Sequence, residues 1–152
     1  MDVKNPPTRG KSDIAALAKA QHGYVTRKQL LGFGLGQRAI ESRMARGLLI
    51  RVHAGVYAVG HLPTLPVDRA YAALLACGEG AVLSHGTAAT AWGIDKVWHD
   101  PFEVTVPRRV RRPGLTIHHD RLARQDIRTQ LGLKVTSPAR TVLDIAPGLT
   151  ED

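Results

Sequence analysis

Apolar positions in the first sixty residues follow a helical period three times and a strand period twice. The first helical pattern begins near Ile14, after a start signal at Ser12 or Asp13, and ends before Gly23. Residues 1–10 are polar with a proline pair, and we expect them to form a disordered arm.

Two further helices and two strands are predicted before residue 61. Thr26 and Gln29 have the capping-box spacing, so a second helix begins there. A third helix is expected over 37–46, and strands over 49–53 and 56–59 are joined by "AG". The apolar residues expected on the buried side of the third helix are Ala39, Ile40 and Met44. Three helices followed by a hairpin is the order of a winged helix-turn-helix, which we predict over residues 11–61.

The pattern changes after "HLPTLP", whose two prolines indicate a linker over 62–66. An α/β domain is expected over 67–152, in which Ser84 caps a helix. Strands 102–106 and 115–119 alternate at period two around "PRRVRRPG", which predicts a hairpin with a long loop.

A last helix is expected after Ser137, with Pro138 at its first position and its end at Pro147-Gly148. The predicted fold class is α+β: an N-terminal winged helix-turn-helix followed by a small mixed α/β domain.

Nearly all of the excess positive charge lies in the first segment. The 152 residues carry a net charge of +8, and residues 1–61 hold ten Lys or Arg against three Asp or Glu. Such a concentration is the electrostatic footprint of nucleic-acid contact, although a solvated basic surface has the same composition. The ordered succession of three helices and a basic hairpin favours double-stranded DNA as the partner.

Helix-turn-helix docking assigns roles to individual residues. The N-terminal half of the third helix meets base edges, so we expect Gln37, Arg38 and Ser42 to probe the major groove. The residues expected to contact the phosphate backbone are Arg27, Lys28, Arg43, Arg46, Arg51 and His53.

Four sequence blocks in this order resemble the AbiEi-type antitoxin family and cover about residues 13–146. They are "IAALAKAQHGYVTRKQLLGFGLGQRAIESRMARGLLIRVHAGVYAVG", "AALLACGEGAVLSHGTAATAWGI", "FEVTVPRRVRRPGLTIHH" and "VTSPARTVLDIA". The resemblance implies an autoregulatory repressor that binds operator repeats. It also implies an antitoxin that counters a nucleotidyltransferase toxin without a stable complex, and it leaves open a homodimer on DNA.

Two features depart from that family's pattern. Gly36 stands before the third helix where relatives commonly carry Ser, which weakens the helix cap. Relatives often continue into an endonuclease-like domain, so we expect the second domain to be shortened at its C-terminus. The alternative function is the targeting or interaction portion of a DNA-cleaving protein whose endonuclease-like domain is absent from this chain.

A second basic patch lies between the last two predicted long strands. Its residues are Arg108, Arg109, Arg111 and Arg112, which we expect at a hairpin tip. A second phosphate contact, docking to an acidic partner and a solvated loop all fit this pattern.

No motif predicts catalysis, a metal or a cofactor. Ser84 and His85 are adjacent and are expected to point apart, with Ser84 acting as a cap. A single cysteine, Cys77, without metal-ligand spacing argues against zinc and fits a reducing compartment. We expect a cytoplasmic, non-enzymatic protein that does not contact membranes.

Overall fold

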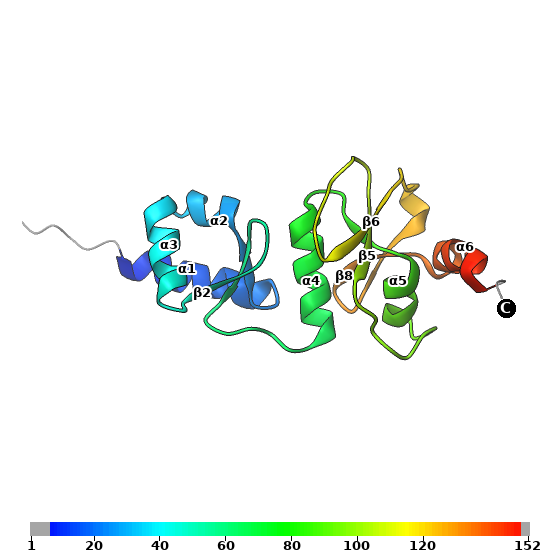
Figure 1. Cartoon of the computed structure of the whole chain (residues 1–152), viewed down its shortest axis with the longest axis horizontal. Coiled ribbons are helices and arrows are strands. Elements are labelled where there is room, and N and C mark those ends of the chain that lie inside the picture. The colour runs from blue at the N-terminus through cyan, green and yellow to red at the C-terminus, as the bar shows by residue number, and fades with distance from the viewer. Residues whose placement is uncertain (1–6, 150–152) are drawn as a thin grey trace, which may run out of the picture. The chain divides into compact units, whose positions relative to one another are not determined.

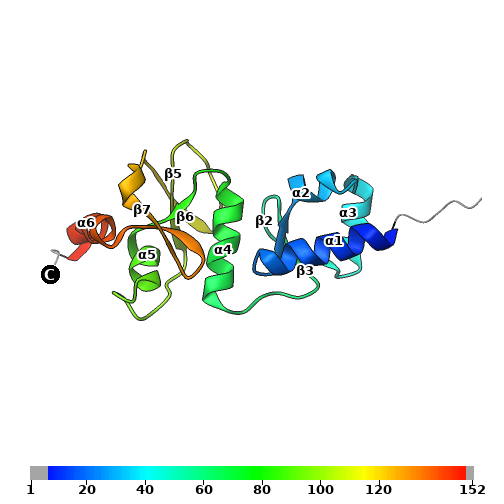
Figure 2. The ribbon, with the colours of Figure 1, turned by 180° about the vertical axis from the view of Figure 1, so that it is seen from behind.

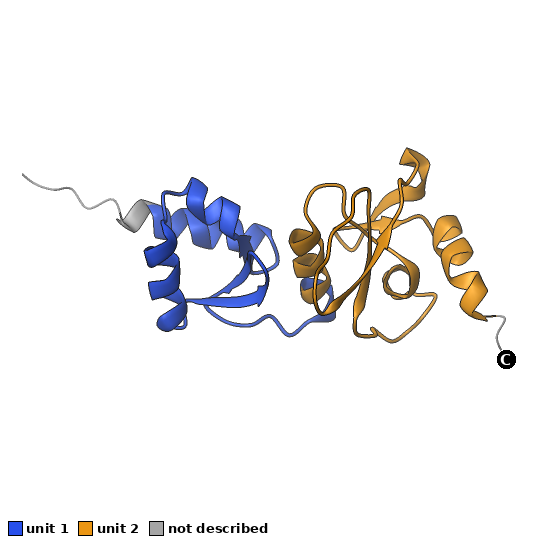
Figure 3. Ribbon diagram, turned by 45° about the horizontal axis from the view of Figure 1, so that its top comes forward, with its two compact units in different colours: residues 1–68 blue, residues 69–152 orange. Residues whose placement is uncertain are grey.

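The computed structural model describes residues 7–149, with side chains from residue 10 onward, and divides into units 1–68 and 69–152 (Figure 3). The first unit has the elements predicted for a winged helix-turn-helix, plus one additional strand. They are α1 (Pro7–Ala20), β1 (Tyr24–Thr26), α2 (Arg27–Gly32), α3 (Gln37–Ala45), β2 (Leu49–His53) and β3 (Val56–Val59). The additional strand β1 pairs with β3, giving an antiparallel sheet of order β1-β3-β2.

The local signals that predicted α2 are present as hydrogen bonds. The hydroxyl of Thr26 accepts the backbone N–H of Gln29 at 3.1 Å, and the Gln29 side chain accepts the N–H of Thr26 at 2.9 Å. This reciprocal pair satisfies two backbone donors at the helix start. Ile40 is 1% exposed and fixes α3 to a core that also contains Leu30 and Leu49.

Two expectations about the first unit are wrong in part. Residues 7–10 form the first turn of α1 instead of part of an arm. Proline is favoured at the start of a helix because its missing N–H would have no partner there. Residues 1–6 of the predicted arm lie outside the described residues. On α3, only Ile40 is buried, whereas Ala39 and Met44 are exposed. The buried face of this short helix is therefore narrower than the positions of its apolar residues led us to expect.

The second unit is a five-stranded mixed sheet of order β6-β5-β4-β8-β7. Its helices are α4 (Pro66–Cys77, beginning just before the unit boundary), α5 (His85–Ala91), the 3-10 turn η1 (Arg124–Asp126) and α6 (Pro138–Leu149). Its strands are β4 (Val82–Leu83), β5 (Phe102–Val106), β6 (Leu115–His119), β7 (Ile127–Gln130) and β8 (Leu133–Thr136). Figures 1 and 2 show α4 and α5 on opposite sides of this sheet. The fold class is therefore α+β, as predicted.

The predicted hairpin of the second unit is wrong. Strands β5 and β6 pair in parallel, with Phe102 opposite Leu115 and Val106 opposite His119. Residues 107–114, here called the crossover segment, therefore run back along the whole length of the strand instead of turning tightly. The local alternation predicted both strands but carried no information on their relative direction.

The last helix follows its predicted start but not its predicted end. The hydroxyl of Ser137 accepts the N–H of Arg140 at 3.2 Å, as a capping residue does. The helix continues through Pro147 to Leu149. Between residues 7 and 149, no helix is both long and apolar enough to cross a membrane.

Candidate nucleic-acid interface

The outer face of α3 carries three of the predicted DNA-contacting residues. At 100° per residue, Arg38 and Ser42 lie on the side opposite Ile40, Arg46 follows at the C-cap, and all three are exposed. Arg43 lies nearer the core and is half-buried. The helix therefore presents a polar face while its single large buried side chain holds it in place.

The structure adds an acidic residue to this face that the sequence interpretation overlooked. Glu41 accepts a hydrogen bond from the Gln37 side chain at 2.7 Å. Because Gln37 is engaged within the helix, its amide N–H is less available for a base edge than the guanidinium of Arg38. Gly36 provides no side-chain cap, as the sequence indicated, so the first N–H groups of α3 have no side-chain acceptor there.

The start of α2 is fixed against the turn of the hairpin. The backbone N–H of Arg27 donates to the carbonyl of Gly55 at 2.8 Å, and the Gly55 φ of +73° permits that turn. The side chains of Gln21 and Gln29 exchange hydrogen bonds of 2.9 and 2.8 Å, which connect the end of α1 to α2. These hydrogen bonds fix the start of α2, the helix on which the exposed Lys28 lies.

The wing carries the remaining predicted contacts. Arg51 is exposed on β2 and lies opposite Tyr57 of β3. The register shifts between Arg51 and His53, which is the signature of a bulge and changes the direction in which the strand presents its side chains. His53 is half-buried and is not without an interaction partner.

The Lys and Arg side chains predicted to contact DNA have no acidic partner among residues 10–149. Among residues 10–149, no carboxylate forms an ion pair with the predicted contacts on α2, α3 and β2, and no side-chain hydrogen bond joins them to other described residues. These cations are Arg27, Lys28, Arg38, Arg43, Arg46 and Arg51. Unpaired, mostly exposed guanidinium and ammonium groups are available to phosphates.

The second basic patch is not a hairpin tip. The Arg112 side chain donates to the carbonyl of Ala76 at 2.6 Å, and Arg108 donates to those of Cys77 and Glu79 at 3.4 and 2.9 Å. These carbonyls lie at and just beyond the C-terminal end of α4, where cationic groups are favoured. Two of the four arginines therefore serve the fold.

A polar cluster at Ser84 was also misjudged. Ser84 is fully buried and makes no side-chain cap; its hydroxyl accepts from Thr105 at 2.7 Å and lies 2.9 Å from Nδ1 of His85. The neighbours meet because His85 has a φ of +51°. The carboxylate of Glu103 accepts the Gly86 N–H at 2.7 Å in place of the missing cap.

The imidazoles of His85 and His118 stack at 3.6 Å within this cluster. Burial, and then the neighbouring His118, hold the pKa of His85 below its ordinary value. The cluster joins α5 to β5 and β6. No three metal-ligating side chains converge anywhere in the part of the chain that the structure describes.

Comparison with known families agrees with both units. A family described as "Transcriptional regulator, AbiEi antitoxin" matches residues 12–60, and the "AbiEi antitoxin C-terminal domain" matches residues 71–151. A search of curated proteins returned no match. The second family covers more than half of the chain, and the two matches follow the order of the two units. This protein belongs to the AbiEi antitoxin family of transcriptional regulators.

Proposed function

We propose that the first unit binds double-stranded DNA and represses transcription from its own operator. In this proposal α3 enters the major groove, where Arg38 and Ser42 contact base edges. Lys28, Arg46 and Arg51 hold the domain on the phosphates, with Arg27, Arg43 and His53 at the margins. The action is binding rather than catalysis, and we place it in the cytoplasm.

The observation that supports this proposal most directly is the unpaired outer face of α3. Arg38, Ser42 and Arg46 are exposed, and Ile40 anchors the helix behind them at 1% exposure. A fixed helix that presents unpaired cations needs little reorganisation to enter a groove.

We further propose that the protein acts as the antitoxin of a nucleotidyltransferase toxin without forming a stable complex with it. The family of both units supports an antitoxin and regulator role. Two copies on inverted operator repeats would match the way winged domains often bind palindromic sites.

The test is binding of the full chain to the DNA upstream of its own gene. Arg38→Ala should cost about 1–3 kcal/mol in operator affinity and relax the preference for one base pair, because a base contact is lost. Arg51→Ala is the matched control: it removes the same charge from the wing and should weaken operator and unrelated DNA equally.

The measurement is fluorescence anisotropy on the operator and on a panel of single-base variants. If Arg38→Ala weakens binding to every sequence by the same factor, Arg38 contacts only the backbone. If the wild-type chain does not distinguish the operator from unrelated DNA, the repressor proposal fails.

A further inference from the structure

The crossover segment separates its four arginines into two pairs. Arg108 and Arg112 point to the end of α4 and donate to its carbonyls. The side chains of Arg109 and Arg111 are exposed, and neither forms a hydrogen bond or an ion pair with any residue from 10 to 149. One pair is therefore bound to the fold, and the other is exposed to solvent.

The segment packs closely against Gly78 and Gly80 at one end and turns into β6 at the other. A Cβ atom at Gly78 would lie 2.8 Å from the Arg108 guanidinium, and one at Gly80 would lie 3.0 Å from the Pro107 ring. At the far end, the N–H of Leu115 donates to the carbonyl of Arg112 at 3.2 Å. The two free arginines are therefore placed by a fixed backbone, which lowers the entropy cost of binding a ligand.

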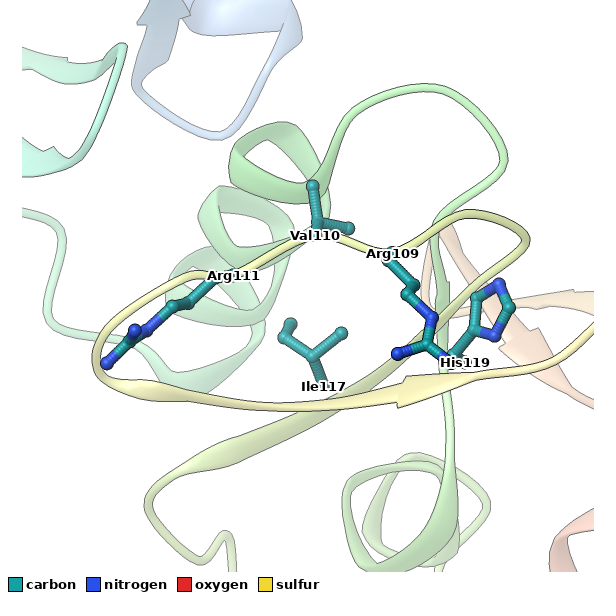
Figure 4. Close-up of a pocket in the computed structure, with 5 residues that line it drawn as sticks. All are labelled: Arg109, Val110, Arg111, Ile117 and His119. Atoms are coloured by element: carbon teal, nitrogen blue, oxygen red, sulfur yellow. The ribbon is translucent and has the colours of Figure 1, made fainter.

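An open pocket of about 650 Å³ lies between the crossover segment and β6. Its lining residues are Arg109, Val110, Arg111, Ile117 and His119. Figure 4 shows the two arginine side chains at its two ends and Ile117 between them. Two cations around an apolar centre, at a volume within the range of about 300–1,000 Å³ for small-molecule sites, fit an anion with a flat organic part.

The imidazole of His119 completes the lining on the β6 side. Its Nε2 lies 3.2 Å from the carbonyl of Pro107, and because a carbonyl only accepts, this nitrogen carries the proton. Its Nδ1 forms no hydrogen bond with another residue from 10 to 149. The adjacent carboxylate of Asp120 is bound by Arg140 at 2.7 Å, so it does not neutralise the pocket arginines.

We propose that this pocket binds the phosphate of a nucleotide, either a free nucleotide or one within a single-stranded nucleic acid. Arg109 and Arg111 contact phosphate oxygens by their forked N–H groups. The base lies against Ile117 and the His119 ring, which provide apolar and stacking contact. The site belongs to the second unit and goes beyond the duplex binding proposed for the first.

The geometry favours a nucleotide over an acidic peptide. The Arg109 and Arg111 side chains lie at the two ends of the pocket with Ile117 between them (Figure 4), so a ligand that spans the pocket meets cations at its ends and apolar surface at its centre. An acidic peptide would use the two charges but would leave the apolar and imidazole surfaces between them without a matching group.

The experiment measures binding of two fluorescent probes, labelled adenosine triphosphate and a labelled single-stranded oligothymidylate, to the full chain. Removing two charge-assisted contacts should weaken binding by about tenfold or more in the Arg109→Ala/Arg111→Ala variant. The matched control, Arg121→Ala/Arg124→Ala, removes two other exposed arginines of the same unit and should change binding by less than about twofold if charge alone is not the cause.

Operator-duplex binding by the Arg109→Ala/Arg111→Ala variant should stay within about twofold of wild type, which separates this proposal from the function of the first unit. The Arg109→Lys/Arg111→Lys variant keeps the charge but loses the fork, and its affinity should lie between wild type and the alanine variant. Circular dichroism checks that each variant is folded.

Each outcome has a fixed meaning. A selective loss of the oligonucleotide assigns a single strand, and a loss that includes the triphosphate assigns a free nucleotide. Equal losses in the control pair, or no loss for either probe, overturn the site. Binding of polyglutamate that depends on Arg109 and Arg111, with no binding of either nucleotide probe, replaces it with an acidic protein partner.

Discussion

The Lys and Arg side chains of the first unit that are predicted to contact DNA are unpaired among the described residues, whereas several arginines of the second unit are bound within the fold. In the first unit, Arg38, Arg46 and Arg51 are exposed and have no described carboxylate partner. In the second, Arg140 is surrounded by acidic groups. Its partners are Asp120, Asp126 and Asp144, at 2.7, 3.6 and 2.8 Å.

This difference in pairing shows that a binding surface cannot be identified from the number of positive charges alone. Arginines of the second unit that serve as structural ties, such as Arg108, Arg112 and Arg140, cannot also hold a ligand at the same N–H groups. What identifies a candidate surface is a cation that is both exposed and unpaired. The cations of α3 and the wing and the Arg109–Arg111 pair meet this criterion, and Arg121 and Arg124, which meet it too, are therefore the control for charge alone.

The largest effect should come from the residue that fixes α3. Ile40→Ala leaves a cavity in the core of the first unit and should lower the free energy of unfolding by about 2–5 kcal/mol. Hydrogen exchange should show that the backbone amides of residues 14–59 lose protection, while the amides of the five-stranded sheet of the second unit remain protected. Met44→Ala, on the same helix but exposed, should change stability by about 0.5 kcal/mol or less.

An equal loss of protection in both units after Ile40→Ala would contradict the division between them. It would mean that the surface described on α3 depends on packing outside the first unit's own core.

The next largest effect should follow removal of the central ion-pairing residue of the second unit. Arg140→Leu leaves three carboxylates without their shared cation and should cost about 1–3 kcal/mol of stability. Operator affinity should be nearly unchanged. Arg121→Leu, an exposed arginine on the same unit, is the control for charge alone, and chemical denaturation measures both.

A stabilised or unaffected Arg140→Leu variant would contradict the structural role given to this arginine. The claim that the paired cations of the second unit stabilise the fold would then fail.

A smaller effect should appear on acidification. The pKa of His85 lies below its ordinary value of 6.5 because of burial and the stacked His118. The unfolded chain therefore takes up this proton first as the pH falls. The stability that depends on neutral His85 is present above pH 6.5 and decreases below it.

His85→Asn should make the stability less dependent on pH between 6.5 and 5. Asn tolerates the positive φ at this position better than most residues. His99→Asn, at an exposed histidine, is the control. A pH profile of His85→Asn that matches the wild type would show that His85 is not the source of the acid sensitivity.

The first unit followed from the sequence more completely than the second. Its signals are local: the capping box at Thr26, the apolar spacing around Ile40 and the alternation of β2 and β3. Strand β1 was missed because its three residues form a strand only by pairing with β3, thirty or more positions away.

The errors in the second unit share a physical cause. The alternation of β5 and β6 predicts strands, but their parallel direction depends on where the crossover segment packs. Arg108 and Arg112 were expected at a hairpin tip, where a ligand contact and a solvated loop both fitted, because the carbonyls that they cap lie about thirty positions earlier in the sequence. The Ser84 and His85 side chains meet because His85 has a positive φ, which the sequence does not predict.

The salt dependence of operator binding tests the central claim most directly. If the exposed, unpaired cations of α3 and the wing neutralise phosphates, log K should fall linearly with log salt, with a slope of about −0.9 for each phosphate neutralised. Arg46→Ala and Arg51→Ala should each make that slope shallower by about 1. A flat salt response, or a slope that depends on Arg108 and Arg112 and not on Arg46 and Arg51, would contradict the account.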